Sequence, residues 1–178
     1  MHKLIRRLIA TGLVSTPRPS AAELTSEARQ SAKALVHRLG RALAVRHVDA
    51  GSCNGCELEI HALSNPYYNL EGLGIHFVAS PRHADILMVT GPVSHHMVAA
   101  LLSAYDALPD PKLVLALGDC ATGNGIFGAN YATVGQVSAV LPVDITIPGC
   151  PPTPTAILAA FVALAEAAIV PCAGTKDP

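Results

Sequence analysis

The sequence predicts an α/β fold built on a doubly wound parallel sheet, because short apolar runs alternate with helix-like stretches along its 178 residues. The apolar runs recur between loops rich in Gly and Pro, at residues 44–50, 75–80, 85–91, 112–118 and 143–149. Several of them read as buried on both faces, which is typical of parallel strands. Helix-like stretches lie between or after these runs, notably at residues 94–107 and 154–170.

Length and composition favour one domain with a substantial core, since 51% of the residues are hydrophobic. The formal net charge is −1, from 12 basic and 13 acidic residues, so the chain lacks the basic footprint of a nucleic-acid-binding protein. Only 14% of the residues are charged. So few charges indicate that a partner protein covers part of the surface, the alternative being an unusually Ala-rich soluble core.

The N-terminal stretch "MHKLIRRLIATGLV" carries Arg6 and Arg7 inside its apolar part, so it does not read as a secretory signal. Its mixture of basic and apolar residues fits an interfacial helix on a membrane or partner, or a leader without structure. A Pro-Ser linker at residues 15–20 separates it from a helical stretch that ends near Gly40.

The chain therefore divides into three expected parts. The apolar run at residues 156–170 is shorter than the roughly 20 residues that a membrane span needs, and it carries Glu166, so it reads as a buried helix. The parts are a leader with a helical extension, an α/β domain and a tail, at residues 1–43, 44–171 and 172–178.

Four of the five cysteines follow predicted strands. Cys53 and Cys56, in "GSCNGCELEI", follow the first strand, whereas Cys120 and Cys150 follow the strands at residues 112–118 and 143–149. Because the carboxyl ends of parallel strands meet at one edge, where ligands of open α/β sheets bind, we expect these thiols to converge there. Cys172 lies beyond the last helix-like stretch, so we expect it to bind no ligand.

A Cys-x-x-Cys pair with two distant single cysteines fits a tetrahedral thiolate site, for either zinc or an iron–sulfur cluster. The Gly/Pro-rich turns around Cys120 and Cys150 supply backbone amides that can close around a cluster, and structural zinc usually draws on paired knuckles. This pattern favours the cluster, with zinc as the alternative. Disulfides are disfavoured because the chain shows no export signal.

Four segments carry a resemblance to a known family: "CNGCELEI", "SPRHADILMVTGPVS", "LGDCATGNGIFG" and "VDITIPGCPPTP". Together they resemble the small subunits of nickel–iron hydrogenases and the related cluster-bearing small subunit of respiratory complex I, over roughly residues 44–165. The resemblance implies a flavodoxin-like fold, with cluster-binding loops at the carboxyl edge of the sheet. It also implies one 4Fe-4S cluster on Cys53, Cys56, Cys120 and Cys150, set against a large subunit that holds the catalytic centre.

Three details refine the resemblance. Asn54 and Gly55 separate the first two cysteines, which is the hydrogenase arrangement, whereas in the complex I subunit these ligands are adjacent. Freestanding uptake hydrogenases carry further cluster cysteines near their C-terminus, and here only Cys172 remains. Glu59 and the stretch "SPRHAD" resemble the complex I side. The combination is similar to membrane-bound, energy-converting hydrogenases, including the formate hydrogenlyase type.

The resemblance assigns two further residues a role near the cluster. Glu59 would face the large subunit and couple proton movement to electron transfer, although a Glu there is often only complementary to the helix dipole. Arg82 would lie in the second shell, where its positive charge stabilises the reduced cluster. By default it would be a solvated loop charge.

The resemblance implies a subunit of an oxidoreductase complex that is not catalytic alone. It would carry electrons beside the nickel–iron centre of a large subunit, peripherally bound on the cytoplasmic side of a membrane, with a ferredoxin-like subunit and a membrane arm as further partners. One alternative is the quinone-side cluster subunit of a complex I-like NADH:quinone oxidoreductase, next to the counterpart of the large subunit. An alternative of another class is a zinc-stabilised interaction module.

Overall fold

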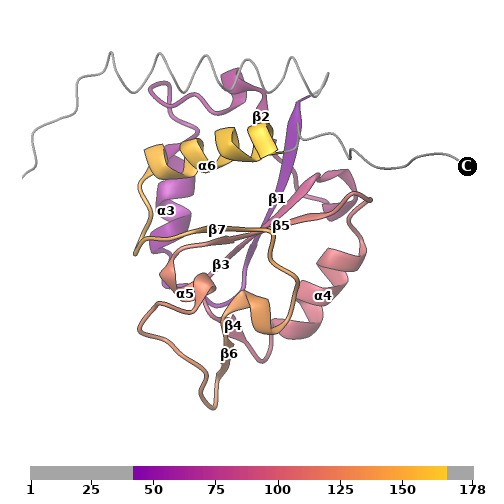
Figure 1. Cartoon of the computed structure of the whole chain (residues 1–178), viewed down its shortest axis with the longest axis vertical. Helices are drawn as coiled ribbons and strands as arrows, with labels where there is room; N and C mark the ends of the chain where they lie inside the picture. Colours follow the sequence, from indigo (N-terminus) through magenta and orange to yellow (C-terminus); the bar gives the residue numbers. More distant parts are fainter. Residues whose placement is uncertain (1–41, 168–178) are drawn as a thin grey trace, which may run out of the picture.

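Five parallel strands form the main sheet of the computed structural model, which describes residues 42–167 (Figure 1). Their order across the sheet is β2-β1-β3-β5-β7, the doubly wound arrangement that the sequence predicts. The strands are β1 (Leu43–Asp49), β2 (Ile75–Phe77), β3 (Ile86–Thr90), β5 (Leu113–Leu117) and β7 (Ile145–Ile147). Each overlaps the apolar run that predicts it, so the predicted fold class is confirmed.

The register of the sheet brings the carboxyl ends of its strands level. Thr90 at the end of β3 pairs with Asp49 of β1 on one side and Leu117 of β5 on the other. Leu117 in turn pairs with Ile147, the last residue of β7. The loops that follow β1, β3, β5 and β7 therefore leave one edge at the same height.

Helices cover both faces of the sheet (Figure 1). Helices α3 (Gly55–Ala62) and α6 (Pro154–Ala167) pack on one face, while α4 (Val98–Asp106) and the short α5 (Asp119–Thr122) pack on the other. Short 3-10 turns complete the connections: η1 (Glu71–Leu73), η2 (Pro81–His83) and η3 (Val137–Ala139). Each β-to-helix connection next to a cysteine thus leads from the sheet edge into a packed helix.

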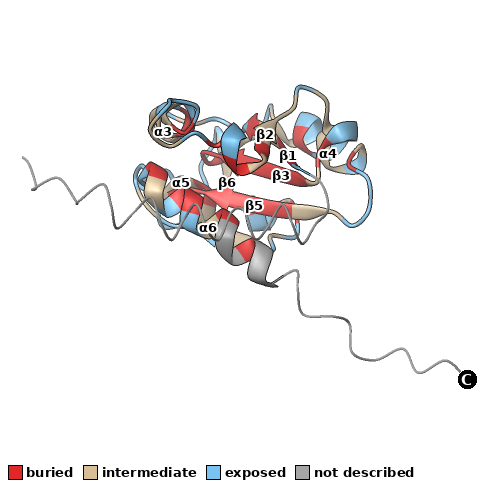
Figure 2. Ribbon diagram, turned by 90° about the horizontal axis from the view of Figure 1, so that it is seen from above, coloured by how far each residue is buried: buried red, intermediate tan, exposed pale blue. Residues whose placement is uncertain are grey.

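Side chains alternate between two cores along the central strands, as the pleat of a strand buried on both faces requires. In β3, Ile86 and Met88 join the core under α3 and α6, and Leu87 and Val89 join the core under α4. Figure 2 shows buried residues concentrated along the central strands, with exposed residues on the outer sides of α3 and α4. The central sheet is therefore a rigid base for the loops at its edge.

A two-stranded antiparallel ribbon corrects the predicted helix at residues 94–107. Strand β4 (Val93–Ser94) pairs with β6 (Thr133–Gly135), and α4 begins only at Val98. The amide of Ser94 donates to the carbonyl of Ala50, which holds this segment in extended conformation beside the end of β1.

Some predicted features lie beyond the described residues: the leader and helical extension up to residue 41, Cys172 and the tail. Between residues 42 and 167, we find no helix with the length and apolar character needed to span a membrane.

Candidate functional site

All four cysteines of the described chain lie at the carboxyl edge of the sheet. Cys53 and Cys56 follow β1, with Cys56 in the first turn of α3; Cys120 lies in α5, directly after β5. Cys150 lies between β7 and α6. The four are free thiols, with Cys53 and Cys150 exposed and Cys56 and Cys120 partly buried.

Glycines stand where any side chain would collide with two of these thiols. A Cβ on Gly118 would lie 2.6 Å from the sulfur of Cys56, and Gly118 also has a φ of +90° that favours glycine. A Cβ on Gly125 would lie 2.7 Å from the sulfur of Cys120. The absence of side chains here leaves room around the sulfurs.

Backbone hydrogen bonds hold the cysteine loops together. The Asp119 carboxylate accepts from the amide of Gly149 at 2.7 Å, while the amide of Asp119 donates to the carbonyl of Gly149 at 2.8 Å. Since Asp119 precedes Cys120 and Gly149 precedes Cys150, this reciprocal pair fixes one loop against the other.

The first cysteine loop is held by Asp49 at the end of β1. Its Oδ1 accepts from the amides of Gly51 and Ser52, at 2.8 and 2.7 Å. Burial raises the pKa of Asp49, but hydrogen bonds from these two amides and from the Ser52 hydroxyl, together with the influence of His47, more than offset it, so the pKa lies below its ordinary value. The carboxylate therefore remains charged and keeps the turn before Cys53 in place.

The thiols lie close enough to affect one another's ionisation. Burial raises the pKa of Cys56 to about 12, with further increases from Glu57 and then from Cys120, Cys53 and Cys150. Burial also raises the pKa of Cys120, and Cys150, Cys53 and Asp119 raise it further. Thiols that resist ionisation in this way require a cation to hold them as thiolates.

The donor set fits an iron–sulfur cluster, because four soft thiolate donors come from three loops and glycines clear the space around two of the sulfurs. Among residues 42–167, no three or more His, Cys, Asp or Glu side chains are grouped as ligands of a single metal ion.

Glu59 and Arg82 are not joined to the thiols by the interactions found in this part of the chain. Glu59 is partly exposed on α3, one turn after Cys56, and Arg82 is exposed in η2, which precedes the amino end of β3. Their roles near a cluster stay predictions.

The sequence reasoning missed a buried polar group next to Cys56. Glu57 is only 7% exposed, and its Oε1 accepts a hydrogen bond from the hydroxyl of Thr90. The Nε2 of His47 lies 2.9 Å from that hydroxyl oxygen and 3.7 Å from Glu57 Oε1. Two features of the sequence could have indicated this group: a His in the first strand and a Thr at the end of an otherwise apolar strand.

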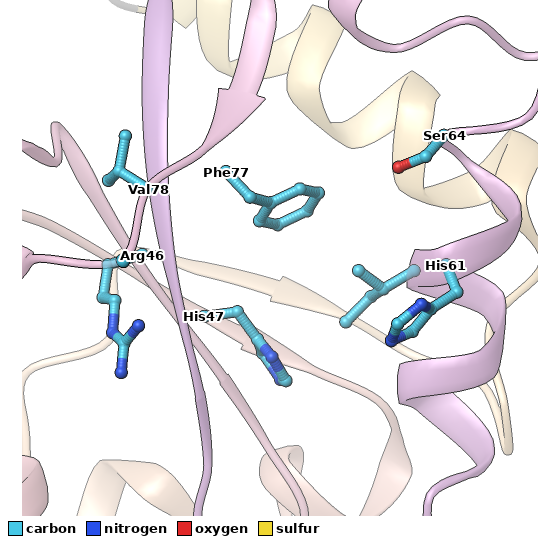
Figure 3. Close-up of a pocket in the computed structure, with 8 residues that line it drawn as sticks. Arg46, His47, His61, Ser64, Phe77 and Val78 are labelled. Carbon is cyan, nitrogen blue, oxygen red and sulfur yellow. The ribbon is translucent and has the colours of Figure 1, made fainter.

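His47 also opens onto a surface pocket of about 410 Å³ between β1, α3 and the end of β2. Figure 3 shows the rings of His47 and His61 facing this space, with the ring of Phe77 beside them. Burial lowers the pKa of His47, while Glu57 and Asp49 oppose that shift. The imidazole is therefore neutral at physiological pH.

The family comparison matches residues 53–164 to a family described as "NADH ubiquinone oxidoreductase, 20 Kd subunit". Over 72% of this chain and 77% of the relative, it is 46% identical to the probable membrane-bound hydrogenase subunit mbhJ of Pyrococcus furiosus. It is also 46% identical to formate hydrogenlyase subunit 7 of Escherichia coli, over 71% of this chain and only 50% of that relative. A subunit of the NADH-quinone oxidoreductase of Desulfovibrio desulfuricans is 42% identical over 62% of this chain and 60% of its own length.

Solved structures agree with these matches. A chain of the membrane-bound sulfane sulfur reductase, an archaeal respiratory membrane complex, superposes with a TM-score of 0.63 at 32% identity, over 75% of this chain and 74% of that one. The [NiFeSe]-hydrogenase of Dm. baculatum shares the fold, with a TM-score of 0.55 at 15% identity, over 74% of this chain and 64% of that chain. The chain therefore belongs to the family of the NADH ubiquinone oxidoreductase 20 kDa subunit, together with subunits of membrane-bound hydrogenases.

Proposed function

We propose that this chain is the electron-transfer small subunit of a membrane-bound nickel–iron hydrogenase complex, with one 4Fe-4S cluster on Cys53, Cys56, Cys120 and Cys150. The observation that carries the proposal is the set of four free thiols on three loops at one sheet edge, in a family that includes hydrogenase subunits. Bound there, the cluster would supply one-electron transfer to and from the centre of a large subunit.

The roles of this chain's own residues are binding and positioning. The four thiols would be the ligands, and the reciprocal contacts of Asp119 with Gly149 would keep two of them at a constant separation. The backbone amide of Phe127 forms a hydrogen bond with the Cys120 thiol, and amide donors of this kind are a recognised means of tuning a cluster's potential.

The spacing of the first two cysteines favours a hydrogenase over a quinone-reducing complex. Cys53 and Cys56 are separated by two residues, as in the hydrogenase arrangement to which the sequence is similar. The 46% identity to two hydrogenase-complex subunits, against 42% to the subunit of the NADH-quinone oxidoreductase, points the same way.

An exposed apolar surface flanks the cysteines and supports contact with a large subunit there. Ile126, Phe127 and Tyr131 follow Cys120 in the α5–β6 loop and are 87%, 47% and 98% exposed. Leu58, two residues after Cys56, is 62% exposed. Aromatic and aliphatic side chains of this kind are common anchors at the centre of protein interfaces. A ferredoxin-like subunit and a membrane arm complete the proposed complex. This chain would be bound peripherally, on the cytoplasmic side of the membrane.

Glu59 is proposed to couple proton movement to this electron transfer. It lies on α3 at the same edge and is partly exposed, so its carboxylate is within reach of solvent and of a partner. Glu59→Gln is expected to retain the iron content and to lower turnover of the whole complex, measured across the pH range. Unchanged turnover at every pH would assign Glu59 the dipole role instead.

Metal analysis of the purified membrane complex tests the proposal. We expect nickel as well as iron and acid-labile sulfide, together with hydrogen evolution from a low-potential donor. A complete complex with iron, no nickel and quinone reduction insensitive to hydrogen would favour the complex I-like alternative. One bound zinc without sulfide would favour the interaction module.

A further inference from the structure

The carboxylate of Glu57 is the buried charge nearest in sequence to a proposed cluster ligand. It follows Cys56 directly, in the first turn of α3, and its side chain is 9% exposed. Solvent therefore screens this charge poorly, and Glu57 contributes to the raised pKa of the adjacent Cys56 thiol.

Two residues from neighbouring strands hold this carboxylate in one place. The hydroxyl of Thr90, which is fully buried at the end of β3, donates to Oε1. A hydroxyl has one proton, so the contact of 2.9 Å between Thr90 Oγ1 and His47 Nε2 requires the imidazole to donate to the hydroxyl. A neutral His47 with its proton on Nε2 thus fixes the hydroxyl, and the hydroxyl fixes Glu57.

No cation is paired with the carboxylate in this arrangement. Its other oxygen, Oε2, is buried and has no hydrogen-bond partner within the described structure, and the three groups include no cation when His47 is neutral. A fixed negative charge at a buried position disfavours the arrival of further negative charge nearby.

We propose that Glu57, positioned by Thr90 and His47, lowers the reduction potential of the cluster held by the four cysteines. The inference rests on the proposed function, since it requires that cluster. Reduction adds one electron to the cluster, and no proton transfer from Glu57 is invoked. Glu57 and Thr90 are positioning and tuning residues rather than catalytic ones.

The test is a redox titration of the cluster in the whole complex at one pH. The EPR signal of the reduced cluster measures the extent of reduction at each potential. Glu57→Gln keeps the shape and the hydrogen bond from Thr90 while it removes the charge. We expect the ratio of reduced to oxidised cluster at a given potential to rise about tenfold, which corresponds to about 59 mV for one electron.

Glu71→Gln is the matched control, because it removes the same charge at an exposed position, in η1. We expect its ratio to change less than about twofold, since solvent screens an exposed charge. Equal shifts in the two variants, or no shift in Glu57→Gln, would overturn the proposal.

Thr90 variants give an independent arm if Glu57→Gln does not assemble. Thr90→Ser keeps the hydroxyl and is expected to keep the potential, whereas Thr90→Val should change it. Where Glu57→Gln does assemble, Thr90→Val is expected to have no further effect in that background, and the same shift in both backgrounds would contradict a role through Glu57. Iron and sulfide counts distinguish failure of the proposed function from failure of this inference. An unmodified complex without a cluster overturns both. A normal iron and sulfide content with an unshifted reduction potential overturns this inference alone.

Discussion

Burial makes the thiols of Cys56 and Cys120 poor ligands until a metal binds, because it raises the pKa of both. The pKa of Cys56, raised to about 12 mainly by burial, means that its thiol keeps its proton at neutral pH. Binding of the proposed cluster would therefore release a proton from this thiol. Removing one of the four proposed ligands would be severe, since the remaining three cannot complete the coordination.

Substituting Cys53, Cys56, Cys120 or Cys150 with Ala is expected to abolish the cluster, because each would supply one of the four protein ligands that we propose. Cys172→Ala is the control and should leave it intact. The measurement is iron and acid-labile sulfide per complex after anaerobic purification, with about four of each expected from this cluster in the unmodified protein. A full complement of both in any of the four variants would remove that residue from the ligand set.

His47 is expected to make the fold sensitive to acid. Burial lowers its pKa in the folded state, so the unfolded chain takes up the proton at a higher pH than the folded chain does. The stability associated with neutral His47 is thus complete above the ordinary His pKa of about 6.5 and is lost as the pH falls through the lower, folded value.

Thermal unfolding of the complex between about pH 5 and pH 8 measures this effect. His47→Gln should flatten the acid side of the profile, whereas His83→Gln, at an exposed position in η2, should not. Profiles that remain parallel in all three proteins would assign the acid sensitivity to other groups.

At the scale of the elements, apolar runs were sufficient to predict all five strands of the main sheet, because a strand buried on both faces has a continuous apolar sequence. The ribbon of β4 and β6 could not be found this way. Its two short strands are held by pairing with each other and by the contact of Ser94 with Ala50, which are tertiary interactions.

The candidate site, too, could be predicted from the sequence only in part. The convergence of the four cysteines followed from strand order, since each lies in a loop or helix that follows a strand. The group of Glu57, Thr90 and His47 did not, because it depends on which face of α3 turns toward β1 and β3. Periodicity in an eight-residue helix is too short to fix that face.

The turn between β5 and α5 should tolerate no side chain at Gly118. Ala there would place its Cβ 2.6 Å from the sulfur of Cys56 and would adopt a φ of +90° that L-residues avoid. We expect Gly118→Ala to lose most of the iron and to destabilise the fold by about 1 kcal/mol or more.

Gly128→Ala is the matched control for this change, because a Cβ at Gly128 would meet no atom within 4 Å. Iron content and the thermal midpoint are measured for both variants. Retention of a full cluster in Gly118→Ala would mean that the Cys56 sulfur has room to move and that the glycine is not required.

For the whole molecule, the low charge and the exposed side chains of the α5–β6 loop predict dependence on a partner. We expect the chain to aggregate when produced alone and to become soluble when a large subunit is coexpressed. Size-exclusion chromatography of both preparations measures this. A monodisperse, cluster-loaded monomer without any partner would contradict the proposed interface.

The loop itself can be tested in the coexpressed complex. Replacing Phe127 and Tyr131 with Ser should weaken copurification of the large subunit by at least about tenfold, as expected for aromatic anchors at an interface. Leu102→Ser is the control, since Leu102 is 39% exposed on α4, on the other face of the sheet from α3. Equal recovery of the partner with all variants would place the interface elsewhere.

The order of the strands also determines how late in biosynthesis the proposed ligand set becomes complete. Cys53 follows the first strand of the sheet, whereas Cys150 follows β7, which is the last strand of the sheet in the sequence and, within residues 42–167, an edge strand paired with β5. The proposed ligand set is thus complete only after about 100 further residues have been made and the final strand has docked. Factors that deliver iron and sulfide would therefore act after the sheet has formed. A nascent chain that stalls before β7 would contain only three of the four proposed ligands.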